Sequence, residues 1–477
     1  MLDLDSPPPQ SLDGANAVRD ALADRVTRFL DARTNGTPRI VRASVPLPRS
    51  VDPLRWVRAQ EGGEAAYWSA RDEAGAVATV GVADVVEQTD RPVDYNALRH
   101  TLDTRLSRAK APIRYYGGLR FDAAQPHENG RLDGPWASFG TVRFVLPRFE
   151  LHVENEQAAL ACNLVLPRDA GAVDTIIEDI HHLSFPGSSP LASLPAPLDR
   201  TDAPNQAEWT RIIQWALGEI ENRTLDKVVL ARRATLNLGS VVDPFLVLQH
   251  LKEATPGCFH FAVQPSGGAA FIGASPERLF RREGDRVVSE AVAGTRARGD
   301  TDAADAALRN ELMESPKERR EHAFVQKAIR EDLEALCTSV EEPDAPSDLA
   351  LARGRHLHVP LTGTLRAGTS TLDVLNALHP TPAVCGLPTD EALAAIRAQE
   401  PFDRGWYAGP VGWIGANAAE FAVAIRSGLV QNETLALFSG AGIVEGSVPE
   451  NEWDEIEQKI GDFASVLGLD GHTANTS

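Results

Sequence analysis

The chain has 477 residues, 43% of them hydrophobic, which is enough for two or three domains or for one large α/β domain. Its formal net charge of −20 at pH 7 argues against nucleic acid and anionic membrane surfaces as partners, and no apolar run approaches the roughly 18 residues of a membrane span. The four cysteines (Cys162, Cys258, Cys337 and Cys385) form no C-x-x-C pair, so they indicate neither a zinc site nor a disulfide framework and favour a reducing cytoplasm.

The N-terminal third is expected to contain mainly short strands. Its first segment, "MLDLDSPPPQSLDG", is acidic and proline-rich and lacks the basic start and apolar core of a signal peptide, so we predict a disordered tail over residues 1–16. "NAVRDALADRVTRFL" predicts a helix, and the runs "VRFVLPRFELHVE" and "AALACNLVLP" predict strands. Residues 185–206 are rich in Pro, Ser and Ala and predict a linker.

Longer helices are expected after the linker. "AEWTRIIQWALGEIENR" places apolar residues at helical spacing, and "KVVLARRATLNL" predicts a strand that begins at Lys227. Residues 302–337 predict a long helical stretch that breaks at Pro316, and a last helix begins near Pro449. Strands outnumber helices, which favours a large antiparallel sheet with helices packed outside it.

Two acidic helix faces are candidates for a metal site. Glu452 and Glu455 are three residues apart on the last predicted helix, and Glu318 and Glu321 repeat that spacing on the helix after Pro316. Mg²⁺ prefers oxygen ligands and is often held by one or two carboxylates together with waters and substrate oxygens. Such pairs of glutamates are common, so a solvated acidic face is the simpler alternative.

Lys227 and Glu277 are candidates for a base and an acid. Lys227 precedes three apolar residues, and burial of an ammonium group favours its neutral form, which can accept a proton. Glu277 lies in "GASPERLF", where partial burial would raise its pKa and let it donate a proton. The alternatives are a lysine at a strand end in water and a surface ion pair between Glu277 and Arg281.

Two glycine-containing segments could bind an anion. "AVAGTR" (291–296) and "GAG" (440–442) could both present backbone N–H groups, although glycines of tight turns are the simpler explanation.

A series of motifs in one order resembles the chorismate-utilising enzymes, which include isochorismate, salicylate, anthranilate and aminodeoxychorismate synthases. The motifs are "KVVLARR", "GASPERLFRREGDRVVSEAVAGTRARG", "SPKERREHAFV", "RHLHVPLTGTL", "LHPTPAVCGLP", "RGWYAGPVGW", "FAVAIRSG" and "SGAGIVEGSVPENEWDEIEQK". The resemblance implies an α/β fold of two packed antiparallel sheets with helices outside, and a buried site for chorismate and Mg²⁺. It implies one catalytic domain over residues 17–470, with an N-terminal part (17–200) and a catalytic core (205–468).

The resemblance also implies a role for individual residues. Lys227 matches the lysine that activates water, and Glu277 matches the general acid. The metal ligands would be Glu321 and Glu455, supported through bound water by Glu318 and Glu452. The expected substrate-binding residues are Gly294, Thr295, His356, Ala383, Tyr407, Arg426, Gly440, Gly442 and Lys459.

Within the family, the motif "HPTPAVCG" is most similar to isochorismate synthases, which carry alanine where the other members usually carry threonine; here it is Ala383. The "AVAGTR" segment lacks the lysine that aminodeoxychorismate synthases place there. We therefore expect a cytoplasmic, Mg²⁺-dependent isochorismate synthase, monomeric or weakly dimeric, that serves menaquinone or siderophore synthesis. A salicylate synthase, an anthranilate synthase large subunit and a chorismate-binding protein without turnover remain alternatives.

Overall fold

The computed structural model describes residues 14–31, 38–47, 51–72, 75–89, 92–123, 134–155, 157–187, 190–266, 268–352 and 354–468. Most of the predicted tail, residues 1–13, lies outside these ranges, and so does the end of the predicted domain at residues 469–470. Residues 15–16, which the prediction placed in the tail, belong to the first helix, because α1 begins at Ala15.

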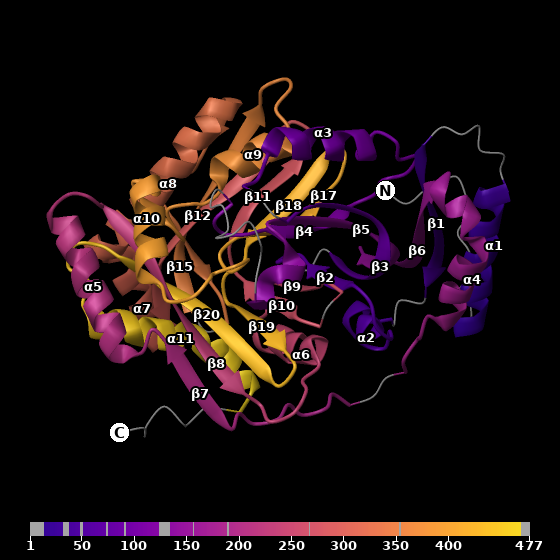
Figure 1. The fold of residues 1–477 in the computed structure, drawn as a ribbon. Coiled ribbons are helices and arrows are strands. Elements are labelled where there is room, and N and C mark those ends of the chain that lie inside the picture. The colour runs from indigo at the N-terminus through magenta and orange to yellow at the C-terminus, as the bar shows by residue number, and fades with distance from the viewer. Residues whose placement is uncertain are drawn as a thin grey trace.

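A continuous antiparallel sheet forms the centre of the molecule (Figure 1). Its strands are β1 (Arg39–Leu47), β2 (Ala65–Ser69), β3 (Gly75–Gln88), β4 (Tyr115–Leu119), β5 (Val142–Glu154), β6 (Gln157–Leu166), β7 (Asp199–Ala203), β8 (Lys227–Asn237), β9 (Phe259–Gln264), β10 (Ala270–Ser275), β11 (Arg278–Glu283), β12 (Arg286–Ala297), β13 (Cys337–Glu341), β14 (Ser347–Ala350), β15 (Gly354–Leu365), β16 (Gly386–Leu387), β17 (Pro410–Ile414), β18 (Ala418–Val423), β19 (Ser427–Gln431) and β20 (Thr434–Ile443).

The sheet has two long arms that meet at β5, the strand that pairs with both β3 and β4, and a short branch β6-β1 that also begins at β5. One arm runs β3-β2-β9-β10-β19-β20-β8, and the other runs β4-β17-β18-β11-β12-β15. The predicted architecture of antiparallel strands with outer helices is confirmed. The strands that the prediction divided between two sheets are hydrogen-bonded into one, because β3 pairs with one edge of β5 and β4 with the other.

Helices cover the outer faces of the sheet. They are α1 (Ala15–Asp31), α2 (Pro53–Arg58), α3 (Tyr95–Leu106), α4 (Val173–His182), α5 (Gln206–Glu221), α6 (Pro244–Ala254), α7 (Asp302–Glu314), α8 (Pro316–Leu336), α9 (Thr371–Leu378), α10 (Thr389–Gln399) and α11 (Pro449–Val466), with 3-10 helices η2 (Gly134–Phe139) and η3 (Arg168–Gly171). In Figure 1, α1 and α4 lie beside β1 and β6 at one end of the molecule, and α5, α7, α8 and α11 lie at the other. None of the helices within the described ranges is long and apolar enough to cross a bilayer.

The predicted break at Pro316 separates α7 from α8. Ser315 is the N-cap of α8, and its side chain accepts a hydrogen bond from the backbone N–H of Glu318. Proline suits the first helical position because its missing N–H would have no intrahelical partner there. The cap and the proline together fix the first turn of α8, which carries Glu318 and precedes Glu321.

The predicted linker over residues 185–206 is partly wrong. Residues 199–203 form the edge strand β7, whose backbone pairs with β8 from Asp199↔Asn237 to Ala203↔Arg233. The side chains of this strand are exposed or partly exposed, so it lacks the apolar alternation by which a strand is found from sequence. Its position is set by backbone pairing with β8.

Aromatic side chains connect the two arms of the sheet inside one hydrophobic core. Phe144 of β5 packs against Phe421 of β18 with ring centroids 5.9 Å apart. Trp136 of η2 packs against Phe271 of β10 at 5.2 Å and Phe438 of β20 at 5.8 Å. Ring pairs of this kind are favourable beyond the area they bury, so they help to hold η2 and β5 against strands of the two arms.

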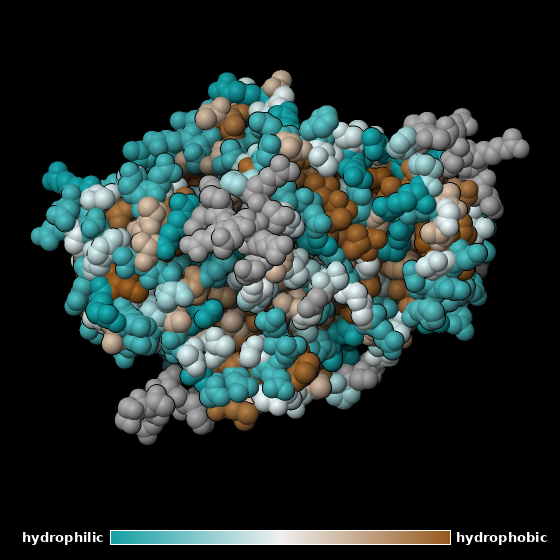
Figure 2. All heavy atoms as spheres, in the orientation of Figure 1, coloured by the Kyte–Doolittle hydropathy of each residue, from teal (hydrophilic) through white to brown (hydrophobic). Residues whose placement is uncertain are grey.

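The surface seen in Figure 2 is mainly hydrophilic, with hydrophobic residues gathered near the strands labelled β4, β5 and β17 in Figure 1. In the described part of the chain, the exposed large hydrophobic side chains are Phe29, Val82, Leu198, Val241 and Val448. The remaining large apolar side chains are buried or partly buried, as expected for a chain with one large core.

Candidate active site

Lys227 is fully buried at the first position of β8. Strand β8 lies between β16, which pairs through Leu387↔Lys227, and β20, which pairs through Ile443↔Val228. Neighbours on both sides exclude water from the start of the strand. Lys227 Nζ is 2.9 Å from Glu321 Oε1 of α8. The alternative of a solvated lysine at a strand end is therefore wrong.

Glu277 is buried between β10 and β11, with 3% of its surface exposed. Its backbone is held on both sides: the Glu277 N–H donates to Ser275 Oγ at 3.2 Å, and its carbonyl accepts from the Val423 N–H at 3.1 Å. No partner of its carboxylate is found among the residues that the structure describes. The surface ion pair with Arg281 is absent there, because Arg281 instead bonds to Glu283 and lies 3.6 Å from Asp72.

The environment of Glu277 favours its protonated form. Burial, followed by the nearby charge of Glu290, raises its pKa to about 8, and the charges of Lys227 and Lys459 act in the opposite direction. Removing an ionised carboxylate from water is costly unless a cation or hydrogen-bond donors compensate. Glu277 therefore carries a proton at neutral pH and can donate it.

Helices α8 and α11 bring the four predicted metal ligands to the site. Each carboxylate has a cationic partner: Glu321 pairs with Lys227 at 2.9 Å, Glu455 with Lys459 at 2.7 Å, Glu318 with Arg296 at 2.8 Å, and Glu452 with Lys317 at 3.3 Å. The Lys317–Glu452 pair joins α8 directly to α11. These helix faces are thus not solvated acidic surfaces, because each carboxylate is neutralised within the fold.

The pKa values of two of these carboxyl groups, Glu452 and Glu455, are shifted in opposite directions. Burial raises the pKa of Glu452. Burial alone would also raise the pKa of Glu455, but Lys459 outweighs it and the pKa is lowered. Glu455 is therefore an ionised oxygen donor at neutral pH, as a ligand of a hard cation must be.

Gly440 and Gly442 lie inside β20 and not in a tight turn. The N–H groups of Val229 and Ala231 bond to Cys385 O and Glu400 Oε1 on the side away from β20. Residues opposite each other in an antiparallel ladder either exchange both bonds or none. Gly442 and Gly440, which lie opposite Val229 and Ala231, therefore direct their N–H groups away from β8, and the predicted contact with an anion stays a prediction.

Missing side chains leave space beside two of the acidic residues. A Cβ at Gly442 would lie 2.7 Å from Glu321 Oε1 and 3.0 Å from Lys227 Cε. A Cβ at Gly294 would lie 2.9 Å from Glu318 Oε2, and the φ of +74° at Gly294, at an irregularity of β12, also favours glycine. Both positions need glycine because the Glu321 and Glu318 side chains occupy the adjoining space.

His356 is buried beside Gly294 and Thr295. Its Nδ1 lies 3.1 Å from the Gly294 carbonyl and 3.2 Å from Thr295 Oγ1. Bonding to a carbonyl requires a hydrogen on Nδ1, so Nε2 is the acceptor of a neutral ring, and it has no partner in the described chain. Burial lowers the His356 pKa to about 3, so the ring stays neutral and can accept a hydrogen bond from a hydroxyl.

A cavity adjoins His356, with an empty volume of about 330 Å³ that is partly open to solvent. Its lining includes Arg426, Cys258 and Pro276, the residue before Glu277. Arg426 Nη1 donates to Asp462 Oδ2 at 2.6 Å. Neither Lys227 nor Glu277 lines this cavity, so it is a space beside the acid–base pair and not its centre.

The other predicted substrate residues differ in how closely they approach the site. Lys459 Nζ donates to Gly440 O at 2.9 Å. Tyr407 is buried and stacks on Phe438, and its hydroxyl would be 3.1 Å from a Cβ at Gly440. Ala383 is partly buried before Cys385, whose carbonyl accepts from the Val229 N–H. No contact between the Ala383 side chain and the other predicted site residues is found in the described part of the chain.

The described residues contain no group of three or more His, Cys, Asp or Glu side chains arranged to hold one metal ion. Mg²⁺ does not require such a group, because one or two carboxylates suffice when waters and substrate oxygens complete its shell. Glu321 and Glu455 supply oxygen donors on α8 and α11, which the Lys317–Glu452 ion pair joins, and position 442, beside Glu321, has no side chain. The residues present therefore fit Mg²⁺ as two ligands and not as a complete protein cage.

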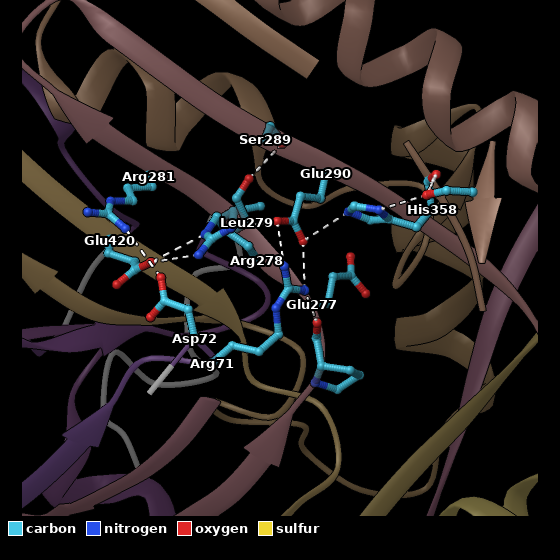
Figure 3. Close-up of polar contacts among 12 residues, drawn as sticks. Arg71, Asp72, Glu277, Arg278, Leu279, Arg281, Ser289, Glu290, His358 and Glu420 are labelled. Atoms are coloured by element: carbon cyan, nitrogen blue, oxygen red, sulfur yellow. Dashed lines mark hydrogen bonds and ion pairs between the residues drawn. The ribbon is translucent and has the colours of Figure 1, made fainter. Parts of the chain in front are cut away.

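Sequence reasoning missed an ionic cluster next to Glu277 (Figure 3). We call it the Glu290 cluster; its members are Glu290, Arg71, Arg278, His358 and Glu420. Three of its members lie within the motifs that resemble the chorismate-utilising enzymes, but their pairing is non-local. Arg71 lies in the turn after β2, where the surrounding "SARDEAG" has no periodic pattern that predicts a partly buried arginine.

Comparison with known proteins is consistent with this geometry. Residues 26–468 match the family model described as "Chorismate binding enzyme". The chain is 31% identical to the chloroplastic isochorismate synthase of Catharanthus roseus, covering 94% of this chain and 85% of the relative. It is 30% identical to isochorismate synthase MenF of Escherichia coli, covering 94% of this chain and 98% of the relative.

A solved structure of the menaquinone-specific isochorismate synthase MenF from Escherichia coli superposes with a TM-score of 0.81 at 29% identity, covering 94% of this chain and 99% of that chain. The similarity therefore extends over the N-terminal part of the sheet as well as the segments that carry the motifs. The family model matches almost the whole described chain, and the protein belongs to the chorismate-binding enzyme family.

Proposed function

We propose that the protein is an isochorismate synthase, which converts chorismate reversibly to isochorismate. The observation that carries this proposal is a buried amine and a buried, protonated carboxyl in one site. Lys227 is fully buried, and Glu277 is buried with a pKa raised to about 8 by burial and by Glu290. Exchange of a hydroxyl between two ring positions needs a base and an acid at the same time, and two residues in different environments provide them.

In the proposed reaction, water attacks ring carbon 2 and its proton passes to Lys227 Nζ, which acts in its uncharged form and not as the ammonium that pairs with Glu321 in this structure. Glu277 donates its proton to the hydroxyl at ring carbon 4, which leaves as water while the ring double bonds shift. One hydroxyl is gained and one is lost, so no oxidant or reductant is required. Transfer of a proton from Lys227 to Glu277 through solvent then restores both groups for the next turnover.

The charged groups around this pair suit a substrate with two carboxylates. Lys459 and Arg426 are the cations available to one carboxylate. Mg²⁺, held by Glu321 and Glu455, would supply positive charge for the other and offset the acidic side chains of α8 and α11. The neutral His356 ring offers Nε2 as an acceptor for a substrate hydroxyl. The similarity to isochorismate synthases of Catharanthus roseus and Escherichia coli supports this activity over the other activities of the family.

The second candidate is a salicylate synthase, which adds elimination of pyruvate to the same first step. Ala383 favours the simpler reaction, because isochorismate synthases resemble this chain at that position.

We also propose a reducing compartment for the protein, since Cys162, Cys258, Cys337 and Cys385 are all buried and unpaired.

The metal ligands can be tested by Glu321→Gln and Glu455→Gln. Each substitution should abolish Mg²⁺-dependent turnover and weaken Mn²⁺ binding measured by electron paramagnetic resonance, because a neutral amide is a poorer ligand of a hard cation. Asp454→Asn, an exposed change on the same helix, is the control. Near-normal turnover with unchanged magnesium dependence in either site variant would contradict the assignment.

The acid and base can be tested by Lys227→Ala and Glu277→Gln. Each should lower kcat by at least about 10²-fold, which is the usual contribution of a positioned proton transfer. Chorismate should still bind, since neither residue is proposed to hold a substrate carboxylate. The measurement is steady-state kinetics together with calorimetric titration of chorismate. A variant that keeps its kcat and shows only a higher KM would mean that the residue binds substrate and does not transfer a proton.

The pH dependence follows from the raised pKa of Glu277. The acid must be protonated to act, and its pKa is about 8, so kcat/KM should fall as the pH rises through about 8. Measuring kcat/KM at saturating Mg²⁺ across this range tests the expectation, and Glu277→Gln should lose this alkaline limb along with most of its turnover. A rate that stays constant well above pH 8 would exclude Glu277 as an acid with this pKa.

The choice within the family can be tested at Ala383. The wild type should form isochorismate with little pyruvate, whereas Ala383→Thr should raise the pyruvate fraction and form some salicylate. The reason is that an ångström-scale change in how the ring is held can alter such a step by about 10²-fold. Chromatography and a coupled dehydrogenase assay measure both products. Stoichiometric pyruvate from the wild type would favour salicylate synthase, and an unchanged ratio in the variant would exclude Ala383 as the cause.

A further inference from the structure

The Glu290 cluster contains a buried carboxylate held by two arginines. Glu290 of β12 has 3% of its surface exposed. Arg71 donates to it through both terminal nitrogens, at 2.8 and 2.7 Å, and Arg278 donates to it at 2.6 Å. In Figure 3 the guanidinium groups of Arg71 and Arg278 point toward Glu290, and His358 Nε2 lies 3.6 Å from it on the other side. Paired bonds between arginine and carboxylate fix both distance and orientation.

Arg71 also contacts the backbone next to the proposed acid. Its Nη1, besides bonding to Glu290, donates to the carbonyl of Pro276 at 2.7 Å. That carbonyl belongs to the peptide bond between Pro276 and Glu277. Arg71 lies in the turn between β2 and β3, and β2 pairs with β9 through Ser69↔His260. A residue of the N-terminal part thus contacts both the charge beside Glu277 and the peptide that carries Glu277.

The charged groups that face Glu277 come from three elements. Glu290 faces it from β12, Lys227 from β8 and Lys459 from α11. Burial would raise the pKa of Glu290, but His358, Arg71 and Arg278 reverse the effect and lower it to about 2. Glu290 is therefore a permanent negative charge near Glu277, and it opposes ionisation of Glu277 while the two lysines favour it.

We propose that Arg71 and Glu290 are positioning residues for catalysis: Glu290 keeps Glu277 protonated, and Arg71 anchors both Glu290 and the Pro276–Glu277 peptide. Neither residue needs to contact the substrate for this role. The inference rests on the proposed role of Glu277 as the acid, and it assigns to the N-terminal part of the chain a specific function at that acid.

The two residues should have different effects when they are replaced. Glu290→Gln removes a negative charge and leaves Arg71 without its carboxylate partner, whereas Arg278 keeps Glu420. Glu277 should therefore ionise more easily, and the alkaline limb of kcat/KM should move down by about 1 pH unit or more. In Arg71→Gln, Arg278 still keeps Glu290 ionised. The alkaline limb of kcat/KM should therefore stay at the same pH or move to higher pH. The Arg71→Gln substitution should nevertheless lower kcat by about 10-fold to 100-fold with little change in KM, because the anchored peptide is released.

A matched control pair lies elsewhere in the N-terminal part. Arg143 donates to Glu64 at 2.9 and 2.6 Å, and both side chains are about as buried as those of Arg71 and Glu290. Arg143→Gln should leave the alkaline limb in place, whatever it does to thermal stability. If Glu290→Gln does not fold, the double variant Arg71→Gln/Glu290→Gln removes both charges together, leaves no unpaired Arg71, and should still move the limb to lower pH.

Infrared difference spectroscopy separates this inference from the role of Glu277 in turnover. The protonated carboxyl band that disappears in Glu277→Gln reports the protonation of Glu277 directly, at fixed Mg²⁺ and without substrate. That band should titrate at lower pH in Glu290→Gln, or in the double variant, than in the wild type. An unshifted band would overturn the inference even if Glu277 is the acid, whereas a shifted band with full turnover in Glu277→Gln would overturn only the catalytic role.

Discussion

The ion pair between Lys227 and Glu321 is the interaction on which the site depends. An ammonium group without water is costly unless an anion compensates it, and Lys227 is fully buried by the strands on both sides of β8. The anion must come from outside the sheet, and it comes from α8, whose carboxylate lies 2.9 Å away. A Cβ at position 442 would crowd both Glu321 Oε1 and Lys227 Cε, so glycine suits the position beside this ion pair.

The same requirement explains how an acidic protein can bind a dianionic substrate. The chain carries a net charge of −20, yet the four site carboxylates on α8 and α11 (Glu318, Glu321, Glu452 and Glu455) are each matched by a lysine or an arginine. Charge is therefore balanced at these four carboxylates, and the surplus of negative charge lies in other parts of the chain. A divalent cation that binds to Glu321 and Glu455 would change this balance in favour of an anion, which is the chemistry that our proposal requires.

Glu277 differs from the other carboxylates of the site because it is not neutralised by a bonded cation. The charged groups nearest to the Glu277 carboxyl group are of both signs, and burial therefore decides that it keeps its proton. Glu290 and Glu277 are both buried. Two arginines keep Glu290 ionised, whereas Glu277 keeps its proton. Pairs of titratable groups with pKa values pushed apart by their environments are characteristic of acid–base catalysis.

The sequence predicted the parts of the site that are local in the chain. Lys227 begins a strand, Pro316 begins α8, and Glu452 and Glu455 lie on one helix, because apolar periodicity and helix-start signals report these features directly. The exposed strand β7 was missed because backbone pairing, which leaves no pattern in side chains, determines it. The partners of two of the acidic residues were not predicted either, since Lys317–Glu452 and Arg296–Glu318 join segments distant in sequence.

Arg71 shows why the N-terminal part has to be folded onto the motif-bearing part. Its turn is held in place by the pairing of β2 with β9, which belongs to the same arm as β10, the strand that leads to Pro276 and Glu277. Its bond to the Pro276 carbonyl spans 205 residues of sequence. A fragment that begins at the motifs would retain Lys227, Glu277 and the acidic helices, but it would leave Glu290 with one arginine fewer and the acid without its anchored peptide. Catalysis at Glu277 would then depend on strands that carry no catalytic residue of their own.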